Sequence, residues 1–164
     1  MRHLPHIITC LLLTMALATA CSDDSCQDNG SSLPLATCYV GGSQTSVSGL
    51  TIMGVGVPGD SLLADSASLS EVYLPLRVNA TTTSYAITRW AYRDTALACF
   101  HDTITFDYQP IEFFHSVECG AMFNFDIKRV DYTTHAIDSV VMLTSLVTNT
   151  RTPSLRIHFT DFNQ

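Results

Sequence analysis

The sequence predicts an all-β protein, an antiparallel β-sandwich of about eight or nine strands with an immunoglobulin-like arrangement. Short segments carry apolar side chains at every second position, turn residues separate them, and no stretch after the N-terminal segment keeps a helical period. Hydrophobic residues make up 46% of the chain and charged residues 14%, a balance typical of a globular domain. A small barrel is the alternative for the same strand pattern.

The first 20 residues predict a signal peptide. An apolar run over 7–17 follows the basic Arg2, is too short to span a bilayer, and ends in small residues before Cys21. Leu17-Ala18-Thr19-Ala20-Cys21 resembles a bacterial lipobox, so we expect a lipid on Cys21 and a membrane as partner. Ser22-Asp23-Asp24 resembles the acidic signal that directs many Bacteroidota lipoproteins to the cell surface. Residues 21–33 are polar and predict a tether, and 34–164 predict a single β-sandwich domain.

Alternation and turn residues place the strands. In the first half we expect strands at 35–40, 50–57, 72–78 and 85–90, with a thirteen-residue polar loop over 58–70. In the second half we expect strands at 104–108, 111–117, 121–127, 137–146 and 155–159. Gln109-Pro110 is expected to turn the chain between two of them, and the more continuously apolar 137–146 predicts a central strand.

Charge and cysteine spacing exclude several classes of function. The formal net charge is −7 and Lys128 is the single lysine, which argues against nucleic acid and against polybasic membrane binding. We expect no cofactor and no metal, because the cysteines lack the close spacing of zinc ligands. After Cys10 leaves with the signal and Cys21 takes the lipid, four cysteines predict two disulfides with three possible connectivities: Cys26, Cys38, Cys99 and Cys119. A hairpin turning at Gln109-Pro110 would bring Cys99 close to Cys119, leaving Cys26 for Cys38.

Gly59-Asp60-Ser61-Leu62 has the letters of the nucleophile block of a lipase and esterase family. A serine nucleophile needs a base held by a carboxylate, and this chain has no Asp-x-x-His. We therefore expect no catalytic residue, and a GDSL-like esterase using Ser61 is the alternative. His115 shares an apolar face with Ile111, Phe113 and Val117 and is expected to be hydrogen-bonded and structural.

Aromatic residues carry a second possibility. Trp90, Tyr92, Phe113 and Phe114 could form a sugar-stacking platform, although alternation favours core packing for them.

The tripeptide of Asp, then Ser or Thr, then a small or aliphatic residue occurs five times. It resembles an O-glycosylation signal of exported Bacteroidota proteins, and Asp, Ser and Thr are also common turn residues. The five hydroxyls are Ser61, Ser66, Thr95, Thr103 and Ser139.

The whole mature chain resembles an uncharacterised family of Bacteroidota envelope lipoproteins known as a domain of unknown function. The matching pieces are Asp23-Asp24-Ser25-Cys26, Leu74-Pro75-Leu76, Thr105-Phe106-Asp107-Tyr108, Ser116-Val117-Glu118-Cys119-Gly120 and Ile157-His158-Phe159. The resemblance implies a Cys26–Cys119 disulfide, which leaves Cys38 for Cys99, and it transfers no catalytic residue.

These patterns together predict a surface-exposed outer-membrane lipoprotein that binds a protein or glycan partner or assists an envelope assembly, and that is not an enzyme. A passive structural component is a further alternative beside the esterase.

Overall fold

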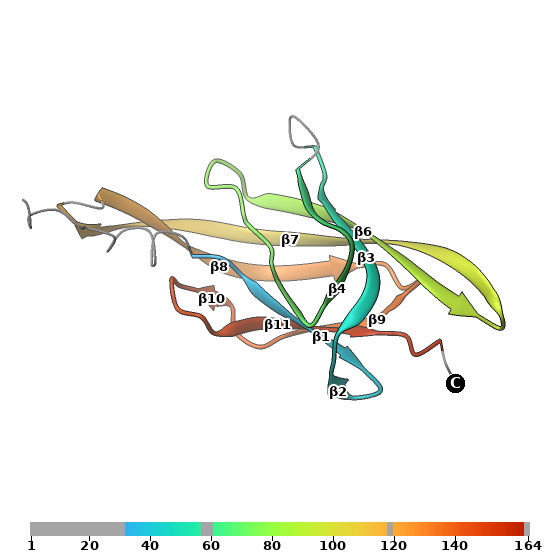
Figure 1. The fold of residues 1–164 in the computed structure, drawn as a ribbon. Coiled ribbons are helices and arrows are strands. Elements are labelled where there is room, and N and C mark those ends of the chain that lie inside the picture. The colour runs from blue at the N-terminus through green and yellow to red at the C-terminus, as the bar shows by residue number, and fades with distance from the viewer. Residues whose placement is uncertain (1–31, 57–60, 118–119, 163–164) are drawn as a thin grey trace, which may run out of the picture.

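The computed structural model describes residues 32–56, 61–117 and 120–162 and confirms an all-β sandwich (Figure 1). Across these residues there are eleven strands and no helix, hence no helical segment able to cross a membrane. The strands are β1 (Leu35–Val40), β2 (Ser43–Gln44), β3 (Val47–Gly54), β4 (Leu62–Leu69), β5 (Glu71–Tyr73), β6 (Thr82–Arg93), β7 (Ala96–Ser116), β8 (Gly120–Tyr132), β9 (Ile137–Met142), β10 (Leu146–Val147) and β11 (Pro153–Phe159).

Two sheets pack face to face. The smaller sheet has the order β2-β1-β11-β9, with β5 also pairing β1, and the larger sheet has the order β10-β8-β7-β6-β3-β4. All pairs are antiparallel except β1 and β11, which run parallel and join the first described strand to the last.

The core lies between the sheets and uses the inward face of each strand. Phe106 is fully buried and meets the ring of Tyr85 edge-on, with ring centroids 6.2 Å apart. Tyr108 meets Phe125 in the same way at 5.5 Å. Edge-to-face pairs add stabilisation beyond the area they bury, so these rings fix how the larger sheet sits on the core.

β7 corrects the expected turn at Gln109-Pro110. It continues through both residues as one strand of 21 residues, roughly 65–70 Å long at about 3.4 Å per residue, and turns only after Ser116 (Figure 1). Proline cannot donate to a strand ladder. Pro110 is tolerated because β7 has no β6 partner beyond Asp107 and pairs there with β8 alone.

The expected loop over 58–70 is also wrong, because it contains β4. This strand pairs with β3 as an edge of the larger sheet, and the pairing shifts register where Asp65 and Ser66 lie opposite Thr51. Ser66 has a φ of 46°, and its amide donates to Thr51 Oγ1 at 3.0 Å. β4 was not predicted because an exposed edge strand can carry polar residues and then shows no apolar alternation.

Two expected strands are shorter than predicted. Of the expected strand 72–78 only residues 72 and 73 are in a strand, as the end of β5 (Glu71–Tyr73), although Leu74 and Leu76 are buried as the alternation implied. The stretch 137–146 divides into β9, an edge of the smaller sheet, and the start of β10, an edge of the larger one, so it is not a central strand.

Candidate functional site

The β6–β7 hairpin extends the larger sheet beyond the sandwich. Its ladder is unbroken from the pair Thr82 and Asp107 to the pair Arg93 and Ala96. Asp94 and Thr95 form a two-residue turn with φ values of 58° and 108°. Both central residues of a type I′ turn need positive φ, a geometry that suits Asn-Gly much better than Asp-Thr. The hairpin is therefore regular but strained at its end.

The outer face of this hairpin carries an aromatic platform made of Trp90, Tyr92 and Leu97. Tyr92 pairs directly with Leu97, and Trp90 lies two positions before Tyr92, so all three side chains share one face. They are exposed by 46%, 65% and 55% respectively. The expectation that Trp90 and Tyr92 pack in the core is wrong, because successive residues of a strand face opposite sides and both fall on the side of β6 opposite the buried Tyr85 and Ile87.

Gly49 of β3 supports the base of the platform. Its φ is +70°, and a Cβ built on it would lie 2.4 Å from the carbonyl oxygen of Trp90. Any side chain here must push β3 away from the backbone that carries Trp90.

The inner face of the hairpin is covered by the C-terminal residues. Phe100 stacks on Phe162 with centroids 4.4 Å apart. The buried Arg89 donates from Nη1 to the carbonyl of Thr160 at 2.8 Å, and its guanidinium lies 5.0 Å from the Phe162 ring centroid. Burial lowers the pKa of Arg89, and the nearby Asp161 opposes that shift. One face of the hairpin is thus braced while the other is bare.

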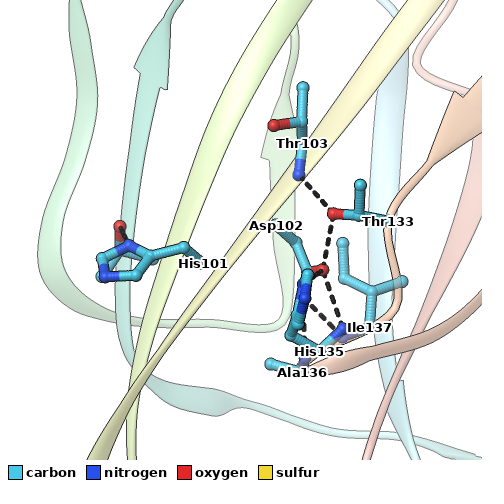
Figure 2. Close-up of polar contacts among 8 residues, drawn as sticks. His101, Asp102, Thr103, Thr133, His135, Ala136 and Ile137 are labelled. Carbon is cyan, nitrogen blue, oxygen red and sulfur yellow. Dashed lines mark hydrogen bonds and ion pairs between the residues drawn. The ribbon is translucent and has the colours of Figure 1, made fainter.

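A buried carboxylate holds the segment that follows β8. Asp102 points inward from β7 and accepts hydrogen bonds from the amides of His135, Ala136 and Ile137 at 2.8, 2.7 and 3.0 Å (Figure 2). The Thr133 hydroxyl donates at 2.7 Å, and His135 Nδ1 lies 3.0 Å from the same carboxylate. Figure 2 shows His101, the preceding residue, on the opposite side of the strand.

Hydrogen bonding decides the charge state of Asp102. Burial by itself would raise its pKa, but the donors from Ala136, Thr133, His135 and Ile137 outweigh burial, and the pKa lies below the usual 3.8. The sequence signal for this residue is an acidic side chain at an inward position in the alternation with Ile104 and Phe106. From the sequence, Asp102 was expected only to precede Thr103 in a glycosylation-like tripeptide, and its buried role was not predicted.

A polar row lies beside the aromatic platform on the outer face. Thr88 Oγ1 is 3.1 Å from His101 Nδ1, and Cys99 Sγ is 3.5 Å from His101 Nε2. The row offers hydroxyl, imidazole and thiol groups next to the rings. Among the described residues no group of three or more His, Cys, Asp or Glu side chains could hold a metal ion.

The predicted Cys38–Cys99 disulfide is absent. Cys38 is buried in the core on β1, whereas Cys99 lies on the outer face of β7, and both are free thiols. Burial raises the pKa of Cys38 to about 11, which makes its thiol unreactive. The geometric case for pairing Cys99 with Cys119 also fails, because the hairpin on which it depends does not turn at Gln109-Pro110. Cys21, Cys26 and Cys119 lie outside the described residues.

Ser61 lines a small cavity of about 160 Å³. Its described lining contains no histidine or carboxylate: Gly54, Ser61, Leu63, Pro75, Leu76, Arg77, Thr83 and Tyr85. Asp60 lies outside the described residues. Nothing in this described lining could take a proton from Ser61 and hold it, as a serine nucleophile requires.

The five hydroxyls of the glycosylation-like tripeptides fall into two groups. Ser61, Ser66 and Thr95 are exposed, whereas Thr103 and Ser139 are half-buried within strands. A modifying enzyme needs an accessible hydroxyl, so the first group suits modification better.

The β7–β8 end corrects the expected apolar face around His115. Ile111 and Val117 are exposed by 40% and 85%, and Phe114 by 70%, so this face is not part of the core. The side chain of His115 is outside the described set. Phe114 therefore lies at the far end of β7 from Trp90 and Tyr92, and the four aromatic residues form no single platform.

Residues 49–159, more than half of the chain, match the model of a family described as "Family of unknown function (DUF6452)". No curated protein and no solved structure matches the chain.

Proposed function

The chain belongs to the family of unknown function DUF6452, and we propose that it is a lipid-anchored envelope protein that binds carbohydrate and catalyses no reaction. The anchor in this proposal is a lipid on Cys21, and the location is the outer face of a Bacteroidota outer membrane. The apolar segment, the small residues before Cys21 and the acidic residues after it support both.

The observation that carries the binding proposal is the aromatic platform. Trp90 and Tyr92 stand about 7 Å apart along one strand and present exposed rings on the same face. Sugars offer flat apolar faces that stack on such rings, while their hydroxyls need nearby hydrogen-bonding partners. Thr88 and His101, next to the rings on the outer face, supply those partners.

A carbohydrate fits this surface better than a protein does. A stable protein interface covers about 800 Å² on each partner and has an apolar centre. The three apolar side chains of the platform instead adjoin a polar ladder, in which Ser84 Oγ lies 2.9 Å from Thr105 Oγ1 and Thr82 donates to Asp107. A narrow strip of rings beside hydroxyl groups suits a sugar chain.

Titration of the intrinsic fluorescence tests the binding proposal directly, because Trp90 is the single tryptophan of the chain. A panel of neutral oligosaccharides should include one that gives a saturable blue shift in the wild type. Tyr92→Ala should weaken that binding at least tenfold. Phe114→Ala removes an equally exposed aromatic side chain from the other end of β7 and should leave binding unchanged.

The absence of any saturable response across the panel would overturn carbohydrate binding. If a protein partner is instead captured from the envelope and lost in Tyr92→Ala, the platform is a protein-binding surface. Covalent capture of Ser61 by a fluorophosphonate probe would overturn the non-enzymatic part of the proposal.

Metabolic labelling with a fatty-acid probe tests the anchor. The wild type should be labelled and Cys21→Ala should not be. An unlabelled wild type would overturn the anchor, and resistance to added protease on intact cells would overturn only the outward orientation.

The same surface location makes the exposed tripeptide hydroxyls sites for O-linked glycans. Intact mass of protein from its native host should exceed the sequence mass, and the excess should fall in Ser61→Ala and Ser66→Ala. A mass without the excess would remove this part of the proposal.

A further inference from the structure

The β7–β8 end carries its own exposed apolar side chains, at Phe114 and Val117. Val117 is 85% exposed and Phe114 70%, more than any other large apolar side chain among the described residues. Phe114 belongs to the part of β7 that has β8 as its only neighbour. Two large apolar side chains at the end of a narrow ribbon form a wedge rather than a broad docking face. We call this pair the apolar tip.

The described chain begins beside the same end of the molecule. The Ser32 hydroxyl donates to Asn124 Oδ1 at 2.8 Å, and Asn124 pairs with Ile111 on β7. β1 starts on the side of the β7–β8 end and runs away from it (Figure 1). The segment between Cys21 and Ser32 therefore joins the domain at the level of Ile111.

The length of that segment limits where a lipid on Cys21 can lie. Ser32 lies eleven positions after Cys21, a stretch that spans at most about 40 Å when fully extended. Val117 follows the last residue of β7 and lies six residues beyond Ile111, about 20 Å at most, whereas Leu97 lies fourteen residues in the other direction, about 47 Å. Cys21 can reach the plane of the apolar tip but not the plane of the aromatic platform.

We propose that Phe114 and Val117 insert into the interfacial region of the bilayer that holds the lipid anchor. The inference rests on the lipidated Cys21 of the proposed function. Exposed Phe and aliphatic side chains partition into this region, between headgroups and acyl chains. The sequence around the apolar tip, 111–117, contains Glu112 and no lysine or arginine, so the contact is apolar and needs no anionic lipid.

A second contact beside the lipid fixes the orientation of the domain. A single flexible tether would let the molecule lie in any direction, whereas tether and tip together hold the β7–β8 end at the membrane. The aromatic platform then stands at the other end of β7, about 65 Å away along the strand.

Tryptophan quenching by brominated lipid tests the insertion. The full-length lipidated protein is reconstituted in phosphatidylcholine vesicles in a Trp90→Phe background, with either Phe114→Trp or Leu97→Trp as the single reporter. These two positions are similarly exposed and lie at opposite ends of β7, so each is the matched control of the other. Flotation of the vesicles in a density gradient measures anchoring independently of the fluorescence.

We expect both variants to float with the vesicles and only Phe114→Trp to be quenched, by at least half, with a blue-shifted emission. Flotation with equal and weak quenching of both reporters would overturn the inference and leave the anchor intact. Failure to float would overturn the anchor and the inference with it. Quenching that requires added anionic lipid would overturn the apolar character of the contact.

Discussion

The two ends of β7 are built by opposite means. At the β6–β7 end the ladder is regular to its last pair, and Phe162 and Arg89 brace the inner face. At the β7–β8 end the register shifts between Asp107 and Tyr108 and again near Phe114, and β8 is the only neighbouring strand. The braced, flat β6–β7 end suits recognition of a rigid ligand. The thin β7–β8 end, with two apolar side chains, suits insertion into a lipid bilayer.

The largest effect should come from the Asp102 clamp, meaning the buried Asp102 carboxylate together with the amides of Ala136 and Ile137 that donate to it. Asp102→Ala leaves the buried amides of Ala136 and Ile137 without an acceptor and should lower the free energy of unfolding by about 3–5 kcal/mol. Urea denaturation measures this change. The matched control is Asp107→Ala on the same strand, which removes an exposed ion pair with Arg129 and should cost less than about 1 kcal/mol. Equal costs for the two variants would contradict the clamp.

The same carboxylate makes stability depend on pH. Because the pKa of Asp102 is lower in the folded state than its usual 3.8, its contribution is present above about pH 4 and is lost as the pH falls through the folded value. The stability difference between wild type and Asp102→Asn should therefore shrink from pH 7 to pH 3. Thermal unfolding at the two pH values measures it, and a difference that grows on acidification would show that the sign is wrong.

The contact between β3 and the base of the platform should give an intermediate effect. Gly49→Ala forces a Cβ against the carbonyl of Trp90 and should cost about 2–3 kcal/mol, with a change in Trp90 fluorescence. Gly42→Ala has a similar positive φ but no atom within 4 Å, so it carries only backbone strain and should cost about 1 kcal/mol. If the free energy of unfolding falls equally in both variants, the close approach of Gly49 to Trp90 does not contribute to stability.

Relieving the turn of the braced end should give a small gain. Thr95→Gly removes a β-branched residue from a φ of 108° and should raise the free energy of unfolding by about 1 kcal/mol, or roughly 3 °C in Tm. Thr45→Gly, at an exposed position outside the positive-φ set, should instead lower Tm slightly. A lower Tm for Thr95→Gly would mean that the Thr95 side chain makes a contact worth more than the strain.

Thiol reactivity should distinguish Cys99, on the outer face of β7, from Cys38, which is buried on β1. In the folded protein Cys99 should react with iodoacetamide, while Cys38 should react only after unfolding.

The Cys26–Cys119 bond stays a prediction. The contact of Ser32 with Asn124 supports it, since Cys26 lies six residues before Ser32 and Cys119 five before Asn124, about 20 Å of chain or less in each case. Peptide mapping without reduction should recover that linked pair, and a peptide linking Cys38 to another cysteine would contradict it.

Alternation predicted the sandwich and much of its core, because the inward residues of a strand between two sheets must be apolar. β1 was predicted with its observed bounds, and Ile104 and Phe106 lie inward as expected. β4 was missed because an edge strand with both faces partly exposed needs no apolar alternation. Pro110 was misjudged because its effect depends on whether β6 lies beside it, which one sequence does not reveal.

Neither the aromatic platform nor the Asp102 clamp could be predicted from the alternation of apolar residues. Trp90 and Tyr92 were expected in the core because large aromatic residues are usually buried, but both lie on the outer face of β6, which no other described strand covers. Asp102 lies at an inward position, where an acidic residue is acceptable only if amides from elsewhere converge on it. That convergence involves residues more than 30 positions away and is visible only in three dimensions.

The parallel pair of β1 and β11 sets the order in which the chain can fold. Leu155 pairs with Ala36, and contacts so distant in sequence carry a large loop-closure entropy and form late. β1 is synthesised long before β11, so the edge of β1 that β11 covers stays unpaired until Pro153–Phe159 is available. During this interval Ala36 and Cys38 are exposed to other chains, and a truncation before Pro153 would make that exposure permanent. Completion of the smaller sheet therefore waits for β11, the last of the described strands.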